Sequence, residues 1–257
     1  MSKDSILSFR FGRQDLVVPA DNFYIPYATY IAGEYDFLDI NDDDIVIDAG
    51  ANIGDFTLKA ARDAELVIAI EPNPDTLELL KFNTKNHKNV VIVEKALGSR
   101  PGKGIVSGNG VTASIQPADG GELIIETLDH IISDLQVRPT LMKMDIEGAE
   151  KFVLPNLACL ESLRKIVIET HSELDWSTCV SALERAGFVC REVTRLQVVS
   201  RTLRNILRMP ISFFLYELST KFYATKIAVS YLFSRSTSIP SCDNAGLKLL
   251  EAHKIPY

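Results

Sequence analysis

The feature that most constrains the fold is an alternation of short apolar runs and helix-like windows that begins near residue 45. Five runs are dominated by apolar residues without polar alternation, at Ile45–Ile47, Leu66–Ile70, Val90–Val93, Leu141–Met144 and Ile166–Ile168. Strands of this kind are buried on both faces. Windows with helical periodicity lie between them, at 54–63, 74–86, 149–160 and 177–186. The pattern predicts an α/β fold with a mostly parallel sheet and helices on both faces.

Charge and cysteine content narrow the class of protein. The 257 residues hold 27 Lys+Arg and 34 Asp+Glu, a net charge of −7, whereas a general nucleic-acid-binding surface is basic. No nucleic-acid partner is therefore expected. The four cysteines form no CxxC motif, and the N-terminus lacks the apolar stretch of a signal peptide. Both observations indicate a cytoplasmic protein.

The segment IVIDAGANIGDFT carries the clearest chemistry. A buried strand ends at Asp48, and a tight turn with Gly50, Asn52 and Gly54 leads into a helix. Glycines there let a ligand approach the main chain closely. A second acid, Glu71, follows the next strand, where a carboxylate can accept both hydroxyls of a ribose. The arrangement predicts a nucleotide-type cofactor.

Two cofactors use such a loop, NAD and S-adenosylmethionine (SAM). The NAD fingerprint G-x-G-x-x-G is here filled by Gly50, Asn52 and Asp55. An aspartate in the first helical turn would repel a pyrophosphate. SAM has no phosphate and carries a sulfonium and an ammonium, so nearby acids suit it better. The plain alternative is that Gly50 and Gly54 serve only a tight turn between strand and helix.

Six blocks in order resemble the FkbM family of SAM-dependent methyltransferases: DAGANIGDFTL from Asp48, EPNP from Glu71, ALG from Ala96, ETLD from Glu126, KMDIEGAE from Lys143 and VIETH, which ends at His171. They cover about residues 34–192. The resemblance implies a class I methyltransferase fold, a Rossmann-like seven-stranded sheet with one antiparallel strand. It also implies O-methylation of a hydroxyl on a sugar, glycan, glycolipid or natural product.

The resemblance places eight residues at the cofactor: Asp48, Gly50, Asn52, Gly54, Glu71, Pro72, Asn73 and Ala96. The first four form the loop on the methionine side, Glu71 becomes the ribose ligand, and Ala96 lies near the adenine contacts. The cofactor half says little about the acceptor atom. An N- or C-methyltransferase acting on a small metabolite, and a non-catalytic SAM-binding subunit of an assembly, remain alternatives.

Candidate catalytic residues follow the fourth and fifth core strands, because ligands of open α/β sheets sit at the carboxyl ends of strands. His171 is the candidate base, since its ordinary pKa of about 6.5 suits neutral pH. Asp145 or Glu147 would orient that imidazole or accept the proton directly. Lys143 would bind an acceptor oxygen or form a structural ion pair. Glu147 has a second interpretation, as a helix cap.

A divalent metal is a further option, because the strand ends carry an oxygen-rich set that suits Mg²⁺ or Ca²⁺. Its expected ligands are Asp145, Glu169 and His171, with Glu147 close by. Such an ion would lower the pKa of the acceptor hydroxyl.

The flanking segments divide the chain into three parts, an N-terminal hairpin and aromatic cap over 1–40, a SAM-binding core over 41–200 and a helical extension over 201–257. Turns and hairpins are expected at 94–126, a strand pair at 188–199, and solvated loop at Asp42–Asp44. Arginines and large apolar residues over 203–233 suggest a cap or homodimer surface, a membrane-surface helix, or a core helix pair. A lipid-linked acceptor would need membrane association.

Overall fold

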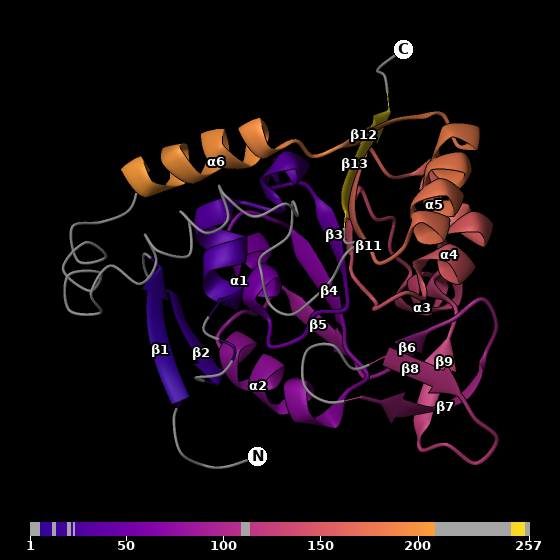
Figure 1. Cartoon of the computed structure of the whole chain (residues 1–257). Coiled ribbons are helices and arrows are strands. Elements are labelled where there is room, and N and C mark those ends of the chain that lie inside the picture. The colour runs from indigo at the N-terminus through magenta and orange to yellow at the C-terminus, as the bar shows by residue number, and fades with distance from the viewer. Residues whose placement is uncertain are drawn as a thin grey trace.

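The computed structural model describes residues 6–11, 14–19, 22, 24–108, 114–208 and 248–254, and its centre is a seven-stranded sheet (Figure 1). The strands are β3 (Ile45–Ala49), β4 (Leu66–Ile70), β5 (Val90–Val93), β10 (Leu141–Met144), β11 (Lys165–Thr170), β12 (Phe188–Glu192) and β13 (Lys248–Lys254). Their order is β12-β13-β11-β10-β3-β4-β5. β13 runs antiparallel to both neighbours and the other pairs are parallel. The class I methyltransferase fold is thereby confirmed.

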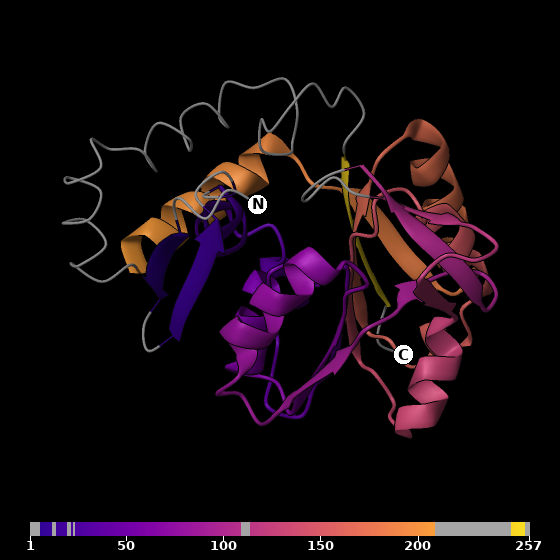
Figure 2. The same cartoon turned by 90° about the horizontal axis from the view of Figure 1, so that it is seen from below.

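Helices cover both faces of this sheet (Figure 2). One layer holds α1 (Asp55–Ala61), α2 (Pro74–Thr84) and α6 (Arg195–Arg208), and the other holds α3 (Leu128–Leu135), α4 (Glu150–Val153) and α5 (Glu173–Arg185). Neighbouring strand residues point to opposite layers. Val46 packs with Phe56 of α1, whereas Ile47 packs in the cluster with Leu183 of α5. Burial on both faces explains why the inner strands β3, β4 and β10 are mostly apolar along their length.

Two small sheets flank the core. The N-terminal hairpin pairs β1 (Ile6–Phe11) with β2 (Gln14–Pro19), as predicted. The insert at 94–126 forms a four-stranded sheet in the order β6-β9-β7-β8, from β6 (Ala96–Leu97), β7 (Gly102–Ser107), β8 (Ser114–Pro117) and β9 (Leu123–Glu126). The aromatic segment contains a π-helical turn, Tyr27–Ala32, and a 3₁₀ turn, Asp36–Leu38. Its Tyr27, Tyr30 and Tyr35 are at most 7% exposed, so they belong to the core.

The structure corrects several local predictions. The expected strand pair at 188–199 is a strand followed by a helix, because Val198 and Thr202 are spaced for the buried face of α6. The partner of β12 is instead β13, which lies beyond residue 200 yet completes the central sheet. Pro155 ends α4 early, and the predicted helix continues as 3₁₀ turns at 154–156 and 158–161. Residues 209–247, and with them most of the 203–233 segment, lie outside the described residues.

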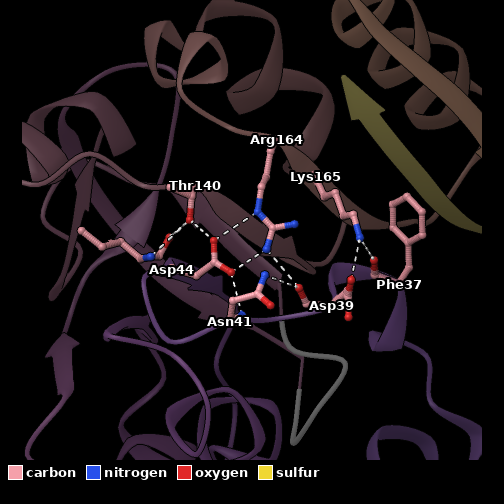
Figure 3. Close-up of polar contacts among 8 residues, drawn as sticks. Phe37, Asp39, Asn41, Asp44, Thr140, Arg164 and Lys165 are labelled. Atoms are coloured by element: carbon pink, nitrogen blue, oxygen red, sulfur yellow. Dashed lines mark hydrogen bonds and ion pairs between the residues drawn. The ribbon is translucent and has the colours of Figure 1, made fainter. Parts of the chain in front are cut away.

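A polar cluster at the amino ends of three strands corrects the prediction of a solvated loop at Asp44, whereas Asp42 and Asp43 are exposed as predicted (Figure 3). Asp44 is only 2% exposed. Its carboxylate accepts hydrogen bonds from the Thr140 hydroxyl at 2.6 Å, the Asn41 amide at 2.8 Å and two guanidinium nitrogens of Arg164 at 2.5 and 3.2 Å. Asp44 therefore ties together the starts of β3, β10 and β11. Burial would raise the pKa of Asp44, but the bonds from Arg164 and Thr140 lower it overall.

Replacing Asp44 by alanine should lower the free energy of unfolding by about 2–3 kcal/mol, because the partners of a buried carboxylate lose their acceptor. The exposed neighbour Asp43 supplies the control, and Asp43→Ala should change the stability by less than about 0.5 kcal/mol. Urea unfolding at pH 7 measures both. Because the pKa of Asp44 is lower in the folded protein than in the unfolded chain, its carboxylate stabilises the fold at pH values above the unfolded-state pKa. The difference in free energy of unfolding between wild type and Asp44→Ala should therefore shrink below about pH 4. Equal stability of the two variants would contradict this role.

Candidate active site

The loop after β3 forms the tight turn that its glycines predicted. Gly50, Asn52 and Gly54 all have positive φ angles, of +77°, +51° and +87°. A Cβ atom at Gly50 would lie 1.7 Å from the backbone oxygen of Asp145, which no side chain can tolerate. The amides of Gly50 and Ala51 both donate to the Ile70 carbonyl at 3.0 Å. The loop is thus held tightly between the ends of β4 and β10.

Asp48 and Lys143 form a buried ion pair beneath this loop. The two residues lie opposite each other in the β3–β10 register and point to the same face of the sheet. Lys143 Nζ is 3.2 Å from Asp48 Oδ1 and also donates to the Gly50 carbonyl, while the Thr57 hydroxyl donates to Asp48 Oδ2 at 2.5 Å. Burial would lower the pKa of Lys143, but the Asp48 carboxylate raises it overall. Lys143 therefore forms a structural ion pair, the second of the two roles that the sequence suggested for it.

Glu71, at the end of β4, connects two loops through its carboxylate. Oε2 accepts the Asn52 amide at 2.7 Å, and Oε1 accepts the Asn73 amide and the Thr76 hydroxyl, both at 2.9 Å. The side chain is buried, with 6% exposure, and burial raises its pKa. Glu71 thus holds the glycine loop against the start of α2, at the tip of the strand where the sequence predicts a ribose ligand.

These loops enclose a cleft of about 660 Å³, open mouth included. Six of the eight predicted cofactor residues line it: Gly50, Asn52, Glu71, Pro72, Asn73 and Ala96. Asp48 and Gly54 are not among the lining residues; Asp48 pairs below the loop, and Gly54 packs near Leu80. Sequence reasoning missed Thr76, Lys95, Leu97, Ile115, Ile146 and Ala149, which also line the cleft. Ile115 comes from β8, so the inserted sheet forms part of the wall.

The predicted catalytic residues meet at one side of this cleft. Asp145 and Glu147 line it, and His171 lies beside them. His171 Nε2 is 3.3 Å from Glu147 Oε2 and 3.7 Å from Asp145 Oδ1, and its Nδ1 is 3.8 Å from Glu150 Oε1. Glu150 is fully buried and accepts the Ile146 amide at 2.7 Å. It belongs to the quoted KMDIEGAE block, but nothing local in the sequence indicated that it would face His171.

Four acidic residues, Asp145, Glu147, Glu150 and Glu169, surround one imidazole at this side of the cleft. Burial would lower the pKa of His171, but the Glu147 hydrogen bond and the charges of Asp145, Glu150 and Glu169 raise it to about 10. Burial raises the pKa of Glu150 to about 7 and that of Glu169 well above its usual value. The surrounding acids therefore stabilise the protonated form of the His171 imidazole. Such a cluster attracts cationic ligands and repels anionic ones.

The comparison with protein families decides the assignment. A family model described as "Methyltransferase FkbM domain" matches residues 48–190, more than half of the chain. The matched region runs from Asp48 through Glu71 to the Asp145–His171 cluster. The chain belongs to the FkbM methyltransferase family. The family expected from the six sequence blocks is thereby confirmed.

Individual relatives of this FkbM chain are distant. Hexuronic acid methyltransferase AglP of Haloferax volcanii is 28% identical over 178 residues, which cover 65% of this chain and 74% of AglP. Methyltransferase 1 of Beauveria bassiana is 27% identical over 189 residues, covering 60% of this chain and 76% of the relative. The solved FkbM methyltransferase of Methylobacillus flagellatus KT aligns with a TM-score of 0.44 at 21% identity, covering 65% of this chain and 44% of that one.

The FkbM chain also offers a set of metal-ligand atoms. One atom each from Asp145, Glu150 and His171 lie within 4.8 Å of one another. Asp145 Oδ1, Glu150 Oε2 and His171 Nδ1 are buried and have no hydrogen-bond partner among the described residues. Two carboxylates and an imidazole suit a divalent cation. Glu169, predicted as the third ligand, is not in this set, and Glu150 takes its place.

Proposed function

We propose that this FkbM chain transfers a methyl group from SAM to a hydroxyl of a sugar, carried on a glycan or a glycolipid. The observation that carries the proposal is the convergence of three features on one cleft. The glycine loop, the Glu71 carboxylate and the Asp145–Glu147–His171 cluster all border it or lie directly beside it.

The lining of the cleft fits SAM better than a dinucleotide. Glu71 is at the strand tip from which a carboxylate can accept ribose hydroxyls. The apolar side chains of Leu97 and Ile115 suit an adenine ring, and the acidic side suits a sulfonium and an ammonium. Asp55 accepts a hydrogen bond from Thr29 at the start of α1, so no phosphate-binding helix end is free there. When bound, SAM supplies the electrophilic methyl group.

The chain's own residues would orient the acceptor and take its proton. As the new C–O bond forms and the S–CH₃ bond breaks, the hydroxyl proton passes to a carboxylate of Asp145 or Glu147, the two acids that line the cleft. His171 does not line it and sits 3.3 Å from Glu147, so it would position these carboxylates. The bases proposed are therefore the two acids, with His171 in the orienting role.

Two observations support the proposed acceptor class. The relative AglP is named as a hexuronic acid methyltransferase, and the reacting side of the cleft carries acidic residues. A sugar acceptor agrees with that name. Asp145 and Glu147 line the cleft and would repel a carboxylate at the reacting position, whereas a neutral hydroxyl meets no such barrier. We therefore favour an ether-forming reaction over methyl-ester formation.

A divalent cation would be held by Asp145, Glu150 and His171. There it would lower the pKa of a hydroxyl brought next to it. Parallel reactions with and without a chelator decide this point. Full activity in the chelator would remove the metal from the proposal and leave the acids as the proton acceptors.

The function is tested by incubating the full chain with SAM that carries a ¹³C-labelled methyl group. The acceptors are a neutral hexoside, a hexuronoside and an amino-sugar glycoside. The chemical shift of the new methyl signal distinguishes an ether, an ester and an N-methyl group. We expect an ether on a sugar acceptor. Exclusive labelling of nitrogen or carbon would overturn O-methylation, and SAM binding without transfer to any acceptor would favour a non-catalytic subunit.

A further inference from the structure

A second pocket, open to solvent and of about 740 Å³ with that open space included, lies between α6, β12 and the 3₁₀ turn at Asp36–Leu38. It shares no lining residue with the cofactor cleft. Three guanidinium groups line it, those of Arg191, Arg201 and Arg204. An acid also lines it, but Asp36 is paired with Lys59 at 2.5 Å and accepts a bond from Asn205 at 2.8 Å. The cavity therefore carries an excess of positive charge.

Arg201 is the most constrained of these arginines. It is 7% exposed, and its NH2 group donates to the fully buried carboxylate of Glu251. Arg191 donates to the other oxygen of Glu251 at 2.8 and 2.9 Å. The single negative charge of Glu251 thus neutralises only part of the positive charge of the two guanidinium groups. Arg201 NH1 is buried and has no hydrogen-bond partner among the described residues.

The outer face of α6 is apolar beside this cavity. Leu196, Leu203 and Leu207 are 81%, 58% and 85% exposed, and their spacing of seven and four residues places them in one stripe. Arg204 is exposed and lies next to the stripe. α6 contains four arginines and no acid. Figure 1 shows the helix along an outer edge of the molecule. Exposed leucines in a row, flanked by cations, are typical of helices that lie at a membrane surface.

We propose that α6 docks on an anionic phospholipid surface, with a headgroup phosphate in the Arg191–Arg201–Arg204 cavity and the three leucines at the boundary with the acyl chains. The excess of guanidinium groups selects a phosphate, and the adjoining leucine stripe selects a lipid over a free anion. No helix among the described residues is long and apolar enough to cross a bilayer, so α6 would lie on the surface.

The test is sedimentation of the full chain with vesicles of phosphatidylcholine, with or without phosphatidylglycerol. We expect binding only to the anionic vesicles. Because the changed side chains are exposed, Leu196→Ser/Leu207→Ser and Arg204→Glu should keep the fold and each weaken binding at least about tenfold. The single changes Leu174→Ser and Arg185→Glu on α5 are controls of the same kind at exposed positions, and each should alter binding less than about twofold.

Competition with glycerol phosphate distinguishes phosphate binding by the arginines from membrane contact by the leucines. It should weaken vesicle binding of the wild type but have little effect on the residual binding of Arg204→Glu. The proposal is overturned if the wild type binds no vesicles, or if the leucine variant binds as tightly as the wild type. It also fails if the protein binds glycerol phosphate but not vesicles, or if the leucine changes only dissociate a dimer.

Discussion

Replacing Glu71 by alanine is expected to weaken SAM binding at least about 100-fold. Hydrogen bonds to a charged group contribute roughly 1.5–3 kcal/mol each, and a ribose offers two hydroxyls, so at about 1.4 kcal/mol per factor of ten the loss exceeds two orders of magnitude. The substitution also removes the acceptor of the Asn52 and Asn73 amides, which shape the cleft. Isothermal titration calorimetry measures the affinity.

Glu78→Ala is the control for this variant, because Glu78 lies on α2 and is exposed. It removes the same charge from the same region without touching the cleft. Its SAM affinity should stay within about twofold of wild type. A Glu71→Ala protein that remains folded and binds SAM within threefold of wild type would contradict the assignment of the ribose site.

Asp145→Asn should lower methyl transfer by about 10²–10⁴-fold, the usual contribution of a positioned proton acceptor. The amide preserves the shape of the side chain but does not take up a proton. SAM affinity should fall far less than turnover, and that split distinguishes a catalytic role from a collapsed cleft. Glu147→Gln, made alongside, shows which of the two carboxylates accepts the proton. Single-turnover rates at saturating SAM are the measurement.

Glu173→Gln, a change at an exposed acid, is the control for Asp145→Asn. Glu173, at the start of α5, is 75% exposed at its side chain, and Glu173→Gln removes one charge near the same end of the sheet. It should leave the rate within about twofold. Turnover near the wild-type rate in both Asp145→Asn and Glu147→Gln would place the proton acceptor elsewhere.

The sequence predicted those strands and loops whose pattern lies within one contiguous stretch of residues. The five apolar runs became β3, β4, β5, β10 and β11. Burial on both faces explains the pattern of the inner strands, whereas the edge strand β5 is only partly buried. The glycine loop and EPNP block are contiguous stretches of chain, so the residues of the cofactor cleft could be named in advance. α3 was missed, although Thr127 caps it and accepts the His130 amide at 3.3 Å. That N-cap before an amphipathic stretch was a usable signal.

Contacts between distant segments could not be predicted. Asp42, Asp43 and Asp44 look alike in the sequence, and only the approach of Arg164 and Thr140 distinguishes the buried Asp44. β13 is far from β12 along the chain and pairs with it through long-range register. Lys143 had two open interpretations until the β3–β10 register placed Asp48 opposite it. Pairing of this kind depends on the folded topology, which no local pattern encodes.

The central claim is that the cleft bordered by Gly50, Glu71 and Asp145 binds SAM, and titration of the wild-type chain with SAM tests it most directly. We expect saturable one-to-one binding with a dissociation constant on the order of 10 µM, in the usual range for enzyme substrates. Glu78→Ala should bind equally and Glu71→Ala should show little heat. Absence of SAM binding by the folded protein, or binding of NADH in its place, would contradict the account.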